Sequence, residues 1–424
     1  MSKSSDKIQE AFAVLGLPGF RFFLLYRFFI TCATLMQSVV IGWHLYSLTH
    51  NVMVLGFVGL TEVIPQVSIA LIAGHFVDRW DRKKIILYAS SLLLLGSALL
   101  VVYCLPGVDG YRRFGVLPVF VTVFFTGLTR GILLPAHTAL LGQIVPRMLY
   151  ANASTWNSAN WQVAAVTGPA IGGLLYGLLG IVPAYGAVFL FYLMAWLMIA
   201  GIVSPGPPMP DEQQGEAMME SIRQGIRFVW NNPVLLGAMT LDMFGVLFGG
   251  AVAMLPAFAS DVLHTGPQGL GWLRAAPAIG AILMSVVLAF FPPVRKTGFL
   301  LLTCVAGFGL SMIAFALSRH YALSFFCLLM SGVFDNVSVV IRGTLVQLFT
   351  PDAMKGRVAA VNSIFIGSSN ELGAFESGLA ARWMGLVPSV IFGGMITLLV
   401  VVAVSKIFPA LRRLSLQEKI SQVP

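Results

Sequence analysis

Between two long apolar runs lies a short charged stretch, Gly74-His75-Phe76-Val77-Asp78-Arg79-Trp80-Asp81-Arg82-Lys83-Lys84. The runs on its two sides, residues 53–76 and 84–105, are each long enough to cross a bilayer, because roughly 20 apolar residues in a helix span the hydrocarbon. Other apolar runs end in similar basic groups, as at Arg295-Lys296 and Arg412-Arg413. This arrangement predicts membrane-spanning helices joined by short basic connections.

The composition also favours a membrane protein. Of the 424 residues, 58% are hydrophobic and 10% are charged, and the mean hydropathy is +0.87, whereas about a quarter of a soluble domain is charged. The net charge of +9 comes from separate clusters rather than a continuous basic face, so no nucleic-acid partner is predicted. The four cysteines lack metal-site spacing. We expect the lipid bilayer as partner, a monomer, no metal and no cofactor.

Twelve apolar runs are candidates for spanning helices, so the predicted fold is all-α. They lie near residues 19–47, 53–76, 84–105, 114–141, 153–179, 183–204, 234–259, 268–292, 298–318, 321–347, 358–385 and 387–410. Basic residues concentrate on the cytoplasmic side of a membrane protein. With both termini cytoplasmic, the inner connections and helix ends hold 18 of the 26 Lys and Arg, and the outer loops hold three. The asymmetry predicts cytoplasmic termini.

The chain is predicted to consist of a six-helix half at 1–203, a cytoplasmic linker at 204–233 and a second six-helix half at 234–424. Within the linker, apolar residues of the stretch 216–230 recur at helical spacing. This pattern predicts an amphipathic helix that either lies on the inner membrane surface or simply joins the two halves.

The two halves repeat each other. Adding 205 to positions in spans four to six reaches matching residues in spans ten to twelve, and an offset of 215 relates the first spans of the halves. The matched pairs include Gly127/Gly332, Gly168/Gly373, Gly173/Gly378, Gly180/Gly385, Pro183/Pro388 and, with the larger offset, Gly56/Gly271. Because each half has an even number of helices, both run in the same direction through the membrane, as in the parallel repeats of secondary transporters.

The charged stretch resembles the signature loop of the major facilitator superfamily. Gly74, Asp78, Arg79, Arg82 and Lys83 match its pattern, and Asp81 stands where many members have Gly. In that family the loop latches the cytoplasmic gate, and its aspartate faces the start of span eleven. The resemblance extends over essentially the whole chain, so it implies the major facilitator fold.

A segment of span five, Thr167-Gly168-Pro169-Ala170-Ile171-Gly172-Gly173, looks like the antiporter signature of drug-exporting facilitators. Gly168, Pro169, Gly172 and Gly173 carry the match. Pro169 removes a helical hydrogen bond, and the small residues allow close helix packing. The nearest branches are the enterobactin-exporter-like and macrolide-efflux-like drug:proton antiporters. This likeness implies proton-driven efflux across the bacterial cytoplasmic (inner) membrane.

Ionisable residues inside the spans need a reason, because a charge at the centre of a spanning helix costs about 2.5–3.5 kcal/mol. The repeat relates Arg27 to Asp242, Arg130 to Asp335, and His137 to Arg342. Two hypotheses divide these residues by role, and a third applies to all of them. Arg27, Arg130, His137 and Arg342 are candidates for binding an anionic substrate or holding carboxylates; Asp242, Asp335, Glu62 and Glu371 are candidates for carrying protons; alternatively, these charges form structural salt bridges inside or between the halves.

Three classes of function follow from these patterns. The first is a proton-coupled exporter of a small amphipathic compound, such as a siderophore or drug, working by alternating access. The second is an inward-directed facilitator for a nutrient or iron chelate. The third, a membrane enzyme or an ATP-driven pump, is disfavoured because no P-loop, His-Glu-x-x-His or Gly-x-Ser-x-Gly segment occurs.

Overall fold

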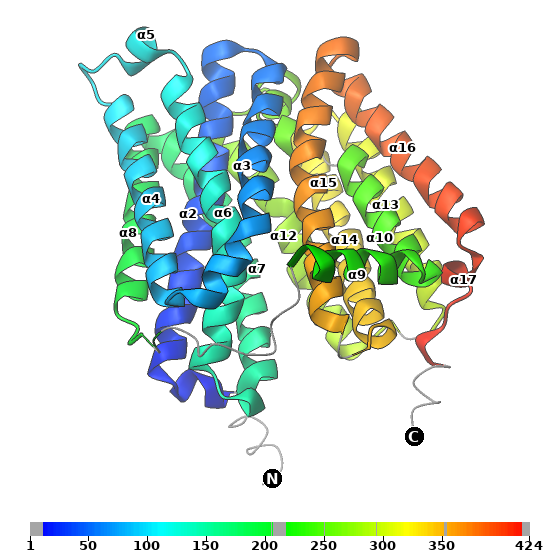
Figure 1. Cartoon of the computed structure of the whole chain (residues 1–424). Helices are drawn as coiled ribbons and strands as arrows, with labels where there is room; N and C mark the ends of the chain where they lie inside the picture. Colours follow the sequence, from blue (N-terminus) through cyan, green and yellow to red (C-terminus); the bar gives the residue numbers. More distant parts are fainter. Residues whose placement is uncertain are drawn as a thin grey trace, which may run out of the picture. The chain divides into compact units, whose positions relative to one another are not determined.

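The computed structural model describes residues 12–204, 206, 218–249, 251–293, 295–351 and 354–417. Over these residues the chain is nearly all helical and contains no strand. It divides into two compact units (Figure 1). Unit 1 holds the described residues of 1–45, 61–212 and 267–271, and unit 2 holds those of 46–60, 213–266 and 272–424. The main change of unit, after residue 212, falls inside the predicted linker.

Unit 1 is built from six long helices, although the first part of α3 belongs to unit 2. These helices are α2 (Pro18–Thr49), α3 (Val52–Arg79), α4 (Arg82–Tyr103), α6 (Leu117–Ile144), α7 (Tyr150–Leu179) and α8 (Ile181–Ala200). Three short elements accompany them: η1 (Ala13–Gly16), α5 (Gly110–Phe114) and η2 (Arg147–Leu149). Helix α4 packs on α6 and α8 inside the unit.

Besides the residues of 46–60, unit 2 contains the linker helix α9 (Met218–Trp230). Its long helices are α10 (Pro233–Gly249), α12 (Pro267–Phe290), α13 (Thr297–Leu317), α14 (Tyr321–Phe349), α15 (Lys355–Met384) and α16 (Leu386–Ile407). Short elements follow α10 and α16: η3 (Ala251–Met254), α11 (Leu255–Ala257), the π-helical η4 (Phe258–Val262) and α17 (Pro409–Arg412). Its core is formed mainly by apolar residues of α10, α13, α14 and α16, including Leu241, Leu301 and Ile341.

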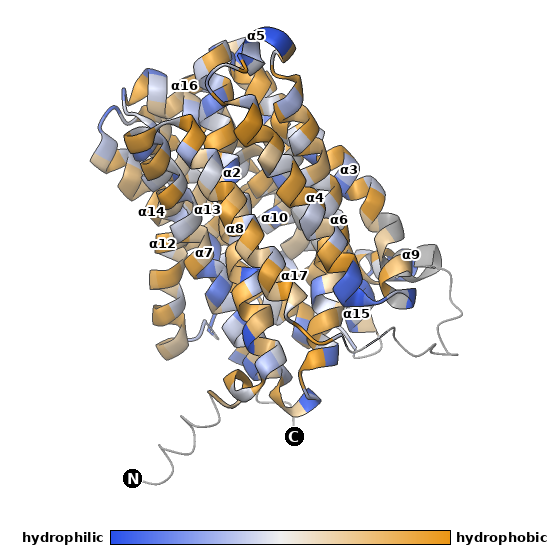
Figure 2. Cartoon of the chain, turned by 90° about the vertical axis from the view of Figure 1, so that its left-hand side faces the viewer, coloured by the Kyte–Doolittle hydropathy of each residue, from blue (hydrophilic) through white to orange (hydrophobic). Residues whose placement is uncertain are grey.

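Eleven helical segments of the described chain are long and apolar enough to cross a membrane. The one remaining predicted span, span eleven at 358–385, coincides with α15, which has 30 residues but is more polar than the others. Large apolar side chains are exposed on the helices, among them Leu95, Leu178 and Phe290, and Figure 2 shows apolar colour along much of the helices. Such exposed apolar surface is suited to contact with lipid. The predicted all-α, multi-pass membrane fold is confirmed; the orientation of the termini stays a prediction.

Span seven, predicted as 234–259, coincides with the candidate span Pro233–Val262, whose described residues form α10, η3, α11 and η4. Pro256 lacks the backbone N–H that a continuous α-helix uses, and it lies where the helix type changes between η3 and η4. Span four, predicted from residue 114, starts as α6 at Leu117, because Gly115 adopts φ +57° and ends α5.

The repeated glycines make equivalent contacts in the two halves. A Cβ on Gly168 would lie 2.7 Å from the carbonyl oxygen of Cys32, and a Cβ on Gly373 would lie 2.7 Å from that of Leu247. Cys32 and Leu247 are themselves related by the offset of 215. A Cβ on Gly127 would meet the backbone of Glu62, and a Cβ on Gly332 would meet the backbone of Pro277. Glu62 and Pro277 are again related by the offset of 215. The repeat is therefore a repeat of helix crossings as well as of sequence.

Helix α9 packs on its own unit. Val229 is buried in an apolar cluster with Met239, Val358 and Val361, which come from α10 and α15. Gly225 approaches the backbone of Arg357 closely, and the Arg357 Nη1 donates to the Gln224 Oε1 at 2.5 Å. Ile226 and Trp230 remain exposed. One face of the predicted amphipathic helix thus covers the start of α15.

Candidate functional site

The charged connection after α3 is tied to neighbouring helices by several hydrogen bonds. The Asp81 carboxylate caps α4 by accepting from the Lys83 and Lys84 backbone N–H groups at 3.0 and 3.3 Å, and it accepts from the Ser204 hydroxyl at 2.6 Å. Arg82 donates to the Ala139 carbonyl, and Lys83 donates to the Ala200 carbonyl at 2.9 Å. The connection thereby joins α3, α4, α6 and the end of α8.

The gate role of this connection stays a prediction. Gly74 and Asp78 lie in α3, and Arg79 is its last residue. The side chain of Asp78 lies outside the described part of the structure, so its predicted contact with span eleven is untested.

The Gly-Pro-x-x-Gly-Gly segment forms close helix contacts in α7. Gly168 and Gly172 face Cys32 and Met36 of α2, where an added Cβ would meet backbone or side-chain atoms within 3 Å. Gly173 faces the start of α12, which belongs to the same unit, at Pro267 and Gly271. Pro169 lies inside the helix. The small residues of this segment thus lie at close helix contacts, and the segment's role in export stays a prediction.

Arg27 lies at the centre of a polar cluster between α2, α6 and α7. Its Nη1 donates to the His137 Nδ1 at 2.7 Å, and its Nε donates to the Asn157 Oδ1 at 3.3 Å. Because a guanidinium has no acceptor, the His137 Nδ1 must be unprotonated, so its Nε2–H donates to the Tyr26 hydroxyl at 2.8 Å. His137 is therefore neutral, and the Arg27 cluster (Tyr26, Arg27, His137 and Asn157) carries one positive charge.

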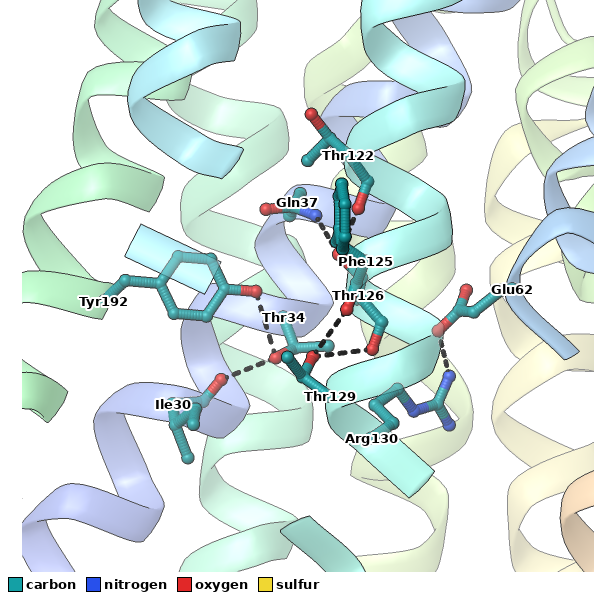
Figure 3. Close-up of polar contacts among 10 residues, drawn as sticks. All are labelled: Ile30, Thr34, Gln37, Glu62, Thr122, Phe125, Thr126, Thr129, Arg130 and Tyr192. Atoms are coloured by element: carbon teal, nitrogen blue, oxygen red, sulfur yellow. Dashed lines mark hydrogen bonds and ion pairs between the residues drawn. The ribbon is translucent and has the colours of Figure 1, made fainter. Parts of the chain in front are cut away.

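A second polar group of unit 1 lies along α6 (Figure 3). Arg130 forms an ion pair with Glu62 of α3, so the prediction that Arg130 holds a carboxylate agrees with the structure. The Thr126 hydroxyl accepts from the Gln37 amide at 3.1 Å and donates to the Thr122 carbonyl at 2.9 Å. These bonds link α2 to α6, whereas the buried Gln37 Oε1 has no hydrogen-bond partner among the described residues.

Asp242 and Arg342 form a buried ion pair between α10 and α14 of unit 2. Asp335, two turns before Arg342 on α14, is reached by no hydrogen bond or ion pair from the described residues, although the Arg342 charge attracts it and the Asp242 charge repels it. Asp242, Asp335 and the buried Ser338 line a small cavity, with room for about one water molecule. With both carboxyl groups ionised, the Asp335 cluster (Asp242, Asp335, Ser338 and Arg342) carries two negative charges and one positive charge.

The two clusters occupy equivalent positions in the repeat. Arg27 and His137 connect the first and fourth helices of the first half, and their counterparts Asp242 and Arg342 connect the same two helices of the second half. The geometry is repeated while the charges differ. Structural ion pairs inside each half, which the sequence left open as an alternative, are present at Glu62–Arg130 and Asp242–Arg342.

Two residues of the site were not predicted as site residues. The repeat pairs Asn157 with Asn362, but only the helix packing brings Asn157 to Arg27 and Ser338 to the cavity. Asp81 was detectable, because an Asp directly before a helix is a common N-cap. The Glu371 side chain lies outside the described part of the structure, so its candidate role in proton coupling is untested.

The family model described as transmembrane secretion effector, of the major facilitator superfamily, matches residues 9–423 of this chain. The chain belongs to this family. It is 27% identical over 410 residues to the enterobactin exporter EntS of Shigella flexneri and of Escherichia coli O81, and the alignments cover 93% of both chains. The protein is thus a membrane transporter, and its likeness to these relatives favours export.

Solved transporters share the fold. A bacterial homologue of the human lysosomal transporter Spinster, in an inward-facing and unoccupied conformation, aligns with a TM-score of 0.69 at 14% identity, covering 93% of this chain and 97% of the other. A peptide transporter POT in complex with sulfate aligns with a TM-score of 0.72 at 13% identity, covering 94% and 96%. These likenesses confirm the predicted major facilitator fold.

Proposed function

We propose that this transporter exports a small amphipathic compound, such as a siderophore or drug, across the bacterial cytoplasmic membrane in exchange for protons. The enterobactin exporters are named for export of a siderophore, and the Gly-Pro-x-x-Gly-Gly segment of α7 is present in full. Both features favour export over the inward-directed alternative.

The arrangement around Asp335 carries the proton-coupling part of the proposal. Asp242 has its counter-charge in Arg342, whereas Asp335 has no ion-pair partner among the described residues and lines the small cavity. A charge inside a membrane helix is costly unless it is compensated. Taking up one proton neutralises Asp335 and balances its cluster, so Asp335 is our candidate for the proton carrier, and Asp242 and Arg342 set the electrostatic field around it.

Alternating access then couples the two fluxes. When Asp335 takes up a proton from the outside, the protonated transporter returns to its inward-facing conformation. Release of the proton inside restores the negative charge of Asp335. The substrate moves outward in the other half of the cycle. The proposal covers siderophores and drugs, so the experiment uses one probe of each kind, enterobactin and the macrolide erythromycin.

Inverted membrane vesicles with an acidic lumen test the proposal. The wild-type protein should accumulate at least one probe, and an uncoupler that collapses the proton gradient should abolish the accumulation. The Asp335→Asn variant should lose the gradient-driven accumulation while keeping normal amounts of protein in the membrane. Asp109→Asn, a matched change in the exposed loop before α5, should transport like the wild type. Accumulation that is indifferent to the gradient, or full coupling in Asp335→Asn, contradicts the proposed mechanism.

A further inference from the structure

The positive charge of Arg27 lies well inside a spanning helix. Arg27 is nine residues from the first residue of α2, which corresponds to roughly 14 Å along a helix. Its side chain is partly buried. An intramembrane arginine needs compensation from hydrogen bonds and a counter-charge, so its partners decide what it does.

Every contact that the described residues make with the Arg27 guanidinium is neutral. The His137 Nδ1 and the Asn157 Oδ1 accept from Nη1 and Nε, and among the described residues no carboxylate contacts this guanidinium. The two acceptors orient the guanidinium, but they leave its charge uncompensated. A guanidinium has five N–H groups arranged as a fork that matches two oxygens of one anionic group, and the two contacts use only part of this fork.

The orientation of Arg27 is supported by a second layer of contacts. The Tyr26 hydroxyl bonds the other ring nitrogen of His137, and the Tyr26 and Phe23 rings pack around the imidazole with ring centroids 5.4 and 6.3 Å away. Tyr26 and Phe23 are almost completely buried. Side chains fixed by packing and hydrogen bonds are the usual support of a binding group.

The equivalent position of the second half shows the alternative arrangement. Asp242 there has its counter-ion Arg342 within the cluster, so that half needs no ligand at this position. The Arg27 cluster retains one positive charge, whereas the Asp335 cluster retains one negative charge. An anion on Arg27 and a proton on Asp335 would each neutralise one cluster.

We infer that the Arg27 cluster is an anion site, which binds a carboxylate or another singly charged acidic group of the transported compound. The inference rests on the proposed exchange mechanism in one respect, because it pairs one substrate anion with one proton. The Arg27 guanidinium binds the acidic group, and His137 and Asn157 position the guanidinium.

Binding to the purified full-length protein tests this site without knowledge of the natural substrate. The probes are 2-naphthoate and its neutral amide, 2-naphthamide, measured by calorimetry at pH 7. Charge-assisted hydrogen bonds are stronger than neutral ones, so the wild type should bind naphthoate at least about tenfold more tightly than naphthamide. Arg27→Gln should remove this preference, and Arg27→Lys should keep part of it because the charge remains without the fork.

Arg21→Gln is the matched control, because Arg21 is an exposed arginine of the same helix and its replacement removes the same charge. It should leave the preference for naphthoate intact. Thermal unfolding of each variant checks that the fold is retained. Equal binding of the two probes by the wild type overturns the inference, and so does an unchanged preference in a folded Arg27→Gln or Arg27→Lys protein.

The outcome is separable from that of the proposed function. Asp335→Asn should still prefer naphthoate although it loses proton-driven transport. An Arg27-dependent preference together with transport that ignores the proton gradient would support the anion site and reject the exchange mechanism. Gradient-driven transport without any preference for the anion would support the exchange mechanism and reject the anion site.

Discussion

Arg27 and Asp242 stand at equivalent positions of the repeat, and each contacts the equivalent residue of the fourth helix in its half. The partner is neutral His137 in the first half and Arg342 in the second. Between packed helices, the free-energy cost of removing a charge from water is offset only by partner groups close to that charge. The Asp242–Arg342 pair is therefore expected to stabilise unit 2 as a pair, because either charge alone would remain buried without compensation.

Removing one member of this pair should cost more than removing both. Arg342→Met leaves the buried Asp242 charge unpaired, and loss of one partner from a buried pair costs about 3–5 kcal/mol in soluble proteins. We expect a clear fall in the thermal unfolding temperature for Arg342→Met and substantial recovery in Asp242→Asn/Arg342→Met. Arg319→Met, in the exposed connection between α13 and α14, should change little. A double variant as unstable as the single one would show that the unpaired Asp242 charge is not the cause of the instability.

At the scale of helices, the repeated glycines determine how closely neighbouring helices approach. The Gly127 position of α6 and the Gly332 position of α14 have no room for a methyl group, because the backbones of Glu62 and Pro277 occupy that space. Gly186 of α8, in contrast, has no other atom within 4 Å of an added Cβ. Glycine at the first two positions is thus a requirement of packing, and at the third it is not.

Alanine substitutions separate these two situations. Gly127→Ala and Gly332→Ala should lower the thermal unfolding temperature of the purified protein, because backbone atoms would have to move. Gly186→Ala should be neutral or slightly stabilising, since alanine exceeds glycine in helix propensity by about 1 kcal/mol. Tryptophan fluorescence during heating provides the measurement. Equal effects at all three positions would mean that helix propensity, and not the close crossing, determines the outcome.

At the scale of the molecule, the sequence predicted the helices and the repeat well because both depend on local patterns. Apolar runs located the spans, and Gly127, Gly168 and Gly173 marked true helix crossings. The 3₁₀ and π-helical turns of residues 251–262 were not predicted, because Gly and Pro are also tolerated inside spanning helices. The partners of Arg27 and Asp335 could not be predicted either. They depend on how each helix is rotated about its axis. The repeat marked Asn157 only as the counterpart of Asn362, and it did not mark Ser338.

The orientation of the whole chain is a prediction from its basic residues, and cysteine labelling tests it. The background protein has all four cysteines, Cys32, Cys104, Cys304 and Cys327, replaced by Ala. One cysteine is then introduced at a time, as Asp109→Cys before α5 or as Arg295→Cys between α12 and α13, and both sites are exposed.

A membrane-impermeant maleimide applied to intact spheroplasts should label Asp109→Cys at once and Arg295→Cys only after the membrane is permeabilised. The physical reason is the retention of basic segments on the cytoplasmic side, since residue 295 belongs to a basic connection predicted to face inward. The reverse pattern would place both termini outside. Labelling of both sites in intact spheroplasts would mean that an odd number of crossings does not separate them, and the twelve-span topology would then need revision between α5 and α13.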